Sequence, residues 1–163
     1  MFLGDSVMGR RYWVDLVPTA VTVAADLLEI TPADDKPVKI ISMNLLQTTE
    51  LGDAAEEIIG LVWVRGNATS GSGGSTVTPT PCGPNDTAAG FTCEVFNTTA
   101  ASTGSPVNGP RHGWNVRAPI ERPYTPEEQF GANQGNTLLV LRMAAAPADS
   151  VTISGSICVE ECD

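Results

Sequence analysis

The stretch that most constrains the fold covers residues 56–75, which read EEIIGLVWVRGNATSGSGGS. Both alternating sets of its first half are largely apolar, with Ile59, Leu61 and Trp63 on one side and Ile58, Val62 and Val64 on the other. This pattern predicts a central strand that is buried on both faces. From Gly66 onward, glycine and serine give backbone freedom and almost no side chain to bury. The sequence therefore predicts a sheet interior that runs directly into a long exposed loop.

The rest of the chain favours short strands joined by irregular connections. Alternating or β-branched runs predict strands at residues 11–17, 19–23, 38–48, 91–97, 114–120, 136–143 and 150–160, with a bend and a short strand in 24–30. Segment 11–17 is expected at a sheet edge, and segments 38–48 and 58–64 are expected to pair with each other in the middle of a sheet. One helical turn is expected at 125–129, where Thr125 can cap and Pro126 can start it.

We therefore expect an all-β, single-domain antiparallel β-sandwich, with a jelly roll as its specific form and almost no helix. Only 17% of the 163 residues are charged, which suits a loop-rich β protein of one domain. The expected organisation is an N-terminal arm at 1–10 and a sandwich at 11–163. Its two long Gly-, Ser- and Pro-rich loops are expected at 66–90 and 98–113.

Charge and hydropathy exclude several classes of partner. Nine Lys and Arg against 19 Asp and Glu give a net charge of −10, which repels nucleic-acid backbones and anionic membranes. No run approaches the ~20 apolar residues of a membrane helix. Residues 1–9 lack the pattern of a signal peptide, so we expect synthesis in the cytoplasm of the producing cell.

The residues with catalytic potential do not form a recognisable catalytic set. His112 is the only histidine, and its Gly-Pro-rich surroundings predict an exposed loop residue without a nucleophile elbow. Adjacent carboxylates such as Glu56 and Glu57 point to opposite faces of a strand and cannot converge on one bond. Gly71-Ser72-Gly73-Gly74 lacks the ending of a phosphate loop. We expect no enzyme activity, no cofactor and no metal site.

Aromatic and cysteine residues are expected to be structural. Trp13, Trp63 and Trp114 all fall in expected strands, so core packing is their default role and a subunit interface the second. Cys82 and Cys93 are the favoured pair if a disulfide forms, while four reduced thiols, including Cys158 and Cys162, are the alternative.

Several turn and cap motifs along the chain resemble those of small β-sandwich structural proteins of tailed bacteriophages. The closest group is the head decoration, or cement, proteins on the outside of the capsid. The motifs that carry the resemblance are Gly52-Asp53-Ala54-Ala55-Glu56-Glu57, Gly71-Ser72-Gly73-Gly74, Thr78-Pro79-Thr80-Pro81, Trp114-Asn115-Val116-Arg117, Tyr124-Thr125-Pro126-Glu127-Glu128, Pro147-Ala148-Asp149 and Glu160-Glu161.

This resemblance implies a virion protein on the outer capsid surface that clamps neighbouring major capsid subunits, commonly as a homotrimer. Long loops and an arm that orders on binding suit such a role. A local excess of arginine could meet an acidic neighbour, although internal pairing with glutamate explains it equally well. The candidate contacts with subunits or capsid are Arg10, Arg11, Ser70, Gly71, Ser72, Gly73, Gly74, Arg111, Arg117 and Arg122.

Two other classes stay open at this point. One is another virion component, such as a tail or fibre subunit or a coat protein, although a fibre would usually show repeats or a coiled coil. The other is a carbohydrate-binding or adhesive sandwich, for which aromatic residues should be exposed rather than placed in strands. A hydrolase is a more distant alternative.

Overall fold

The structure is a computed structural model that describes residues 9–49, 57–133 and 137–162. The described residues form strands and no helix, and every strand pairing is antiparallel. The strands are β1 (Arg10–Val21), β2 (Asp26–Thr31), β3 (Val38–Gln47), β4 (Ile58–Asn67), β5 (Ser75–Val77), β6 (Thr80–Pro81), β7 (Thr92–Asn97), β8 (Val107–Asn115), β9 (Ile120–Pro123), β10 (Gly131–Ala132), β11 (Leu138–Met143) and β12 (Val151–Glu161).

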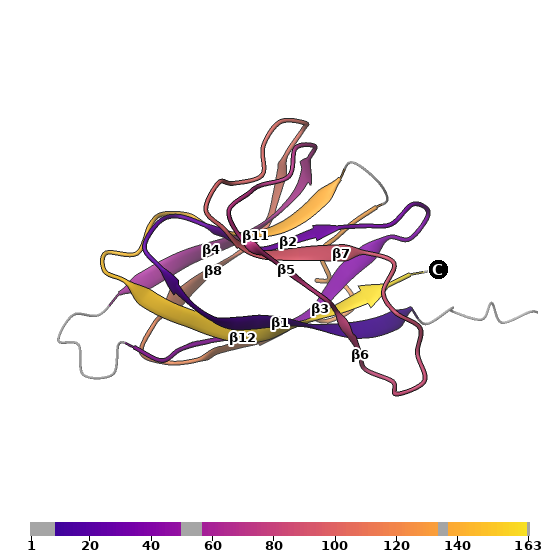
Figure 1. Cartoon of the computed structure of the whole chain (residues 1–163), viewed down its shortest axis with the longest axis horizontal. Coiled ribbons are helices and arrows are strands. Elements are labelled where there is room, and N and C mark those ends of the chain that lie inside the picture. Colours follow the sequence, from indigo (N-terminus) through magenta and orange to yellow (C-terminus); the bar gives the residue numbers. More distant parts are fainter. Residues whose placement is uncertain (1–8, 50–56, 134–136, 163) are drawn as a thin grey trace, which may run out of the picture.

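These strands form two layers that face each other (Figure 1). We call the layer with the order β10-β3-β12-β1-β6 sheet A, in which β9 also pairs with β3. Sheet B has the order β5-β7-β2-β11-β4-β8. The all-β sandwich expected from the sequence is confirmed, whereas its narrower description as a jelly roll stays a prediction.

The core lies between the two sheets and takes side chains from both. Tyr12 and Leu16 of β1 and Ile157 of β12 enter it from sheet A, while Leu28 of β2 and Trp63 of β4 enter it from sheet B, all fully buried. Tyr12 also meets Phe91 edge to face at 5.5 Å between ring centroids. Burial of each such side chain contributes about 1.5–3 kcal/mol to folding.

Strand β4 is apolar on both faces, as its sequence predicts. Its inner face, with Leu61 and Trp63, belongs to the main core. On its outer face, Val62 and Val64 pack with Val140 and with Ala101 from a loop in a second, smaller cluster. The expected pairing of β4 with β3 is wrong, because β4 pairs with β11 and β8 in sheet B while β3 lies in sheet A.

Several expected boundaries are also wrong. Segment 98–113 is not one loop, because β8 begins at Val107 and forms the edge of sheet B, where Pro110 is tolerated. Segment 66–90 contains the short strands β5 and β6. The expected strand at 114–120 is instead the end of β8, a turn and the start of β9. Segment 125–129 forms a turn rather than a helix, closed by the hydrogen bond from Glu128 N to Thr125 O.

Strand β1 is longer and more central than expected. It runs from Arg10 to Val21 between β12 and β6, and its register shifts between Leu16 and Thr19, around Pro18. A bulge at this point accommodates a residue that cannot donate a ladder hydrogen bond. Of the expected N-terminal arm, residues 1–8 lie outside the described residues, and Arg10 already belongs to β1.

Candidate functional site

Two loops pair with each other over the outer face of sheet B and project from the sandwich (Figure 1). We call residues 68–74 and 98–106 the double loop. Thr69 and Ser102 exchange two backbone hydrogen bonds of 2.9 Å, and Ser72 and Thr99 exchange two of 3.0 Å. The hydroxyls of Thr69 and Thr103 add a hydrogen bond of 2.7 Å. The Gly-Ser-rich segment is therefore an ordered part of the fold.

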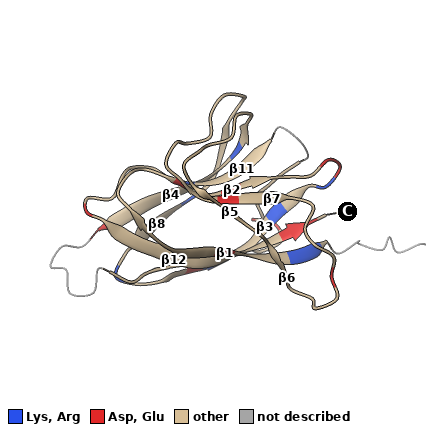
Figure 2. Ribbon diagram, in the orientation of Figure 1, with Lys and Arg blue, Asp and Glu red and all other residues tan. Residues whose placement is uncertain are grey.

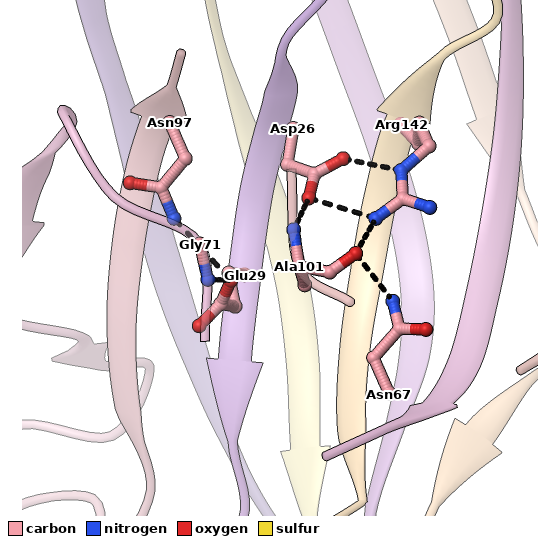
Figure 3. A network of polar contacts seen from close by, with 7 residues as sticks. All are labelled: Asp26, Glu29, Asn67, Gly71, Asn97, Ala101 and Arg142. Carbon is pink, nitrogen blue, oxygen red and sulfur yellow. Dashed lines mark hydrogen bonds and ion pairs between the residues drawn. The ribbon is translucent and has the colours of Figure 1, made fainter. Parts of the chain in front are cut away.

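A buried carboxylate holds the first half of the double loop. Glu29 of β2 is 2% exposed, and its side chain accepts hydrogen bonds from Gly71 N at 2.8 Å, from Ser70 Oγ and from Asn97 Nδ2 at 3.3 Å. Asn97 in turn accepts a hydrogen bond from Gly74 N. A Cβ on Gly71 would lie 2.5 Å from the Thr99 carbonyl oxygen, so only glycine permits this approach. Figure 3 shows how Glu29 lies under the chain at Gly71.

A buried ion pair holds the second half. Asp26 of β2 is fully buried and accepts hydrogen bonds from Arg142 at 2.6 and 3.0 Å and from Ala101 N at 2.7 Å. Arg142 and Asn67 both donate to the Ala101 carbonyl oxygen, at 2.7 and 3.2 Å (Figure 3). The hydrogen bond with Asp26 raises the pKa of Arg142 and keeps it charged. Strands β2, β4 and β11 thus fix the loop that carries Ala101.

The double loop offers a rigid, uncharged surface. Its residues include no Lys, Arg, Asp or Glu, and Figure 2 shows the projecting loops almost free of charged positions. Most of its residues are exposed, including Ser72, Gly73, Ala100 and Thr103. Because the hydrogen bonds within and beneath it already fix its conformation, a partner would bind it with little loss of conformational entropy.

The candidate contact residues do not form one surface in the structure. Ser70 to Gly74 lie in the double loop, but Ser70 turns its hydroxyl to Glu29. Arg10 donates to Thr87 Oγ1 at 2.7 Å, and Arg11 pairs with Glu160 at 3.0 Å. The other arginines lie elsewhere: Arg111 is on β8, Arg117 in the turn before β9, and Arg122 on β9, where it pairs with Glu128 at 3.1 Å.

Cys82 and Cys93, the favoured pair if a disulfide forms, are not bridged in the structure, where both thiols are free. Cys93 faces the core on β7, and burial raises the pKa of its thiol. Cys82 is exposed outside sheet A, where its backbone N–H donates to Arg11 O at 2.8 Å. It neighbours Cys158 instead, whose pKa rises to about 11 through burial first and the Cys82 thiol second.

The expectation of an exposed loop His112 is also wrong. His112 lies on β8, is half-buried, and its Nε2 lies 2.8 Å from the Tyr124 hydroxyl. That hydroxyl accepts a hydrogen bond of 2.9 Å from Trp63 Nε1. Burial first, and the nearby Arg122 second, lower the pKa of His112.

The described residues hold no candidate metal site. Among them, no three His, Cys, Asp or Glu side chains gather as a metal site would require. Within the same ranges, no helix has the length and apolar character needed to cross a membrane. The sequence analysis did not identify Asp26 and Glu29 as the buried acids that hold the double loop. Two acids inside the apolar run AADLLEI could have indicated buried charged residues.

Comparison of the chain with protein-family models, with curated proteins and with solved structures gave no match. Its function is therefore argued from its own residues.

Proposed function

We propose that this chain is a non-enzymatic virion protein that binds the outside of a tailed-bacteriophage capsid and stabilises contacts between major capsid subunits. The observation that carries the proposal is the double loop, which has no charged residue and is held on a rigid sandwich by hydrogen bonds to buried acids. A preformed contact element loses little conformational entropy when it binds, and the buried Glu29 and Asp26 hold the double loop in such a form. The resemblance of the turn motifs to head decoration proteins supports the same assignment.

The proposed active form is a homotrimer on the outer surface of the virion. A symmetric oligomer would present several double loops at once, which raises the overall affinity for a lattice of identical capsid subunits. Membranes and nucleic acid are not among its proposed partners, given the net charge of −10.

Capsid binding can be tested with a matched pair of variants. Ala100→Arg places a large charge on the exposed double loop, and Ala145→Arg makes the same change in the exposed turn after β11, outside the double loop. Purified protein is mixed with expanded empty heads of the phage that encodes it, and co-sedimentation is measured. Wild type and Ala145→Arg should bind, and Ala100→Arg should lose about tenfold in affinity, or 1.4 kcal/mol.

Light scattering of the same preparations measures the oligomeric state, and a trimer is expected. Failure of the wild-type protein to sediment with the heads would refute the function. Equal binding by Ala100→Arg and wild type would instead refute the role of the double loop.

A further inference from the structure

The outer face of sheet A carries a trough with one aromatic wall and small polar side chains on its floor. The trough has a volume of about 370 Å³, within the range of small-molecule sites. Strand register explains its shape, because small side chains in the middle strands lie between larger ones at the sides. Two rows of residues cross strands β1, β12, β3 and β9. One row is Trp13, Cys158, Ser42 and Pro123, and the other is Asp15, Ser156, Asn44 and Glu121.

Trp13 forms one wall of this trough. Its neighbours Tyr12 and Val14 point into the core and are fully buried, whereas Trp13 points outward and is 44% exposed. The expectation that Trp13 packs in the core is therefore wrong. A tryptophan combines a broad apolar ring with a hydrogen-bonding N–H group, which suits a ligand that has both apolar and polar faces.

The floor and opposite wall supply hydrogen-bonding groups. Ser42, Ser156 and Asn44 line the floor, and Glu121 lies across from Asn44 on β9. The Asn44 Oδ1 atom is buried and accepts no hydrogen bond from a described residue. Leaving a buried acceptor unpaired is unfavourable, and a hydroxyl donor from a ligand would remove that cost.

The charges of the trough select against an anionic ligand. Arg122 lines it, with its Nη2 paired to Glu128 and its guanidinium over the Tyr124 ring, so its positive charge is already balanced. Its buried Nε has no partner among the described residues and can donate to a ligand hydroxyl. Glu121 leaves an exposed carboxylate at the wall. A neutral molecule with many hydroxyls fits this set, because hydroxyls both donate to carboxylate and amide oxygens and accept from serine hydroxyls.

A second depression of about 440 Å³ shares Asn44 and Glu121 with the first. It continues past Leu46 to the turn at residues 116–119, which forms its side. The two together form an extended groove along β3 with room for more than one ring.

We propose that this groove binds a neutral oligosaccharide, with one pyranose ring stacked on Trp13 and its hydroxyls bonded to Asn44, Glu121 and the floor serines. The apolar C–H face of a pyranose complements the indole, and its equatorial hydroxyls complement the polar floor. The chain would thereby attach to a neutral glycan through a face distinct from the double loop.

The test uses the purified full chain and four neutral probes: maltotriose, cellotriose, N,N′,N″-triacetylchitotriose and galactobiose. Trp63 and Trp114 are buried, so a change in tryptophan fluorescence on titration reports mainly on Trp13. Calorimetry supplies the affinity. We expect at least one probe to bind, and Trp13→Ala and Asn44→Ala to weaken it about tenfold or more, with Trp13→Phe retaining part of the affinity.

The matched control is Val17→Ala, an equally exposed apolar position on β1 outside the groove, which should bind like wild type. Thermal melting checks that each variant is folded. Absence of binding to all four probes, equal affinity in Trp13→Ala and wild type, or a preference for the anionic probe sialyllactose would each overturn the proposal. Because no capsid is present, these outcomes are independent of the capsid-binding test.

Discussion

At the scale of single residues, the chain Trp63–Tyr124–His112 links the two sheets through hydrogen bonds. Trp63 and His112 belong to sheet B, and Tyr124 follows β9 of sheet A. Since Trp63 donates to the Tyr124 hydroxyl, that hydroxyl has its own proton to give to a neutral His112 Nε2. Burial first, and Arg122 second, lower the pKa of His112, and the Tyr124 contact acts in the same direction because protonation would leave the hydroxyl facing two donors.

We expect His112 to titrate below about 6.5, the ordinary value for histidine. A folded-state pKa below the unfolded one means that its contribution to stability is complete above about pH 6.5 and declines as the pH falls toward the folded-state pKa. Because the chain has one histidine, its imidazole resonance in NMR gives this pKa directly. Tyr124→Phe removes the hydroxyl and should raise the pKa, while a wild-type value at or above 6.5 would contradict the network.

Residue types alone predicted some of these roles. Trp63 and Trp114 are in the core as their strand positions indicate, at 0% and 1% exposed. Trp13 is not, because alternation separates the two faces of β1 without saying which residues face the core, and Tyr12 and Val14 occupy that side. His112 was misassigned because flanking glycine and proline conceal a strand at a sheet edge.

At the scale of elements, the double loop depends on the Asp26–Arg142 pair. Asp26 is fully buried, so removal of Arg142 leaves a carboxylate without its cation. We expect Arg142→Met to lower the free energy of unfolding by about 3 kcal/mol, near the lower end for such pairs because the Arg142 side chain is 26% exposed. Urea denaturation measures the change.

The double variant Asp26→Asn/Arg142→Met should recover part of this loss, because an amide carries no charge and its oxygen can still accept from Ala101 N. Arg111→Met, at an exposed arginine on β8, should change stability by no more than about 0.5 kcal/mol. A loss in Arg142→Met no larger than in Arg111→Met would show that the pair does not hold the loop.

Strand positions were easier to predict than strand partners. β12 shows alternation over residues 151–159 and β3 is a long run rich in β-branched and apolar residues, and the existence and approximate bounds of both strands are confirmed. Their partners depend on which sheet each chain segment enters, and neighbouring strands β3 and β4 separate into different sheets. The ordered conformation of the double loop could not be predicted from the loop residues themselves, because the acids that stabilise it lie on β2, about 40 residues before Gly71.

At the scale of the whole molecule, the two sheets are joined by one continuous core and by polar contacts across it. Glu161 at the end of β12 in sheet A is 2% exposed and accepts hydrogen bonds from Gly90 N and Phe91 N, just before β7 of sheet B. Tyr12 packs on Phe91 beside this contact. Neither sheet can lose its structure without exposing the inner face of the other.

We therefore expect the sandwich to unfold in a single cooperative transition. In a Trp13→Phe background, the remaining Trp63 and Trp114 of sheet B report on that sheet by fluorescence, while far-UV circular dichroism reports on both sheets, and the two urea curves should coincide. Glu161→Gln should shift both midpoints to lower urea by the same amount, because the weakened contact belongs to both sheets. Two separated transitions, in wild type or in Glu161→Gln, would mean that the sheets fold as independent units.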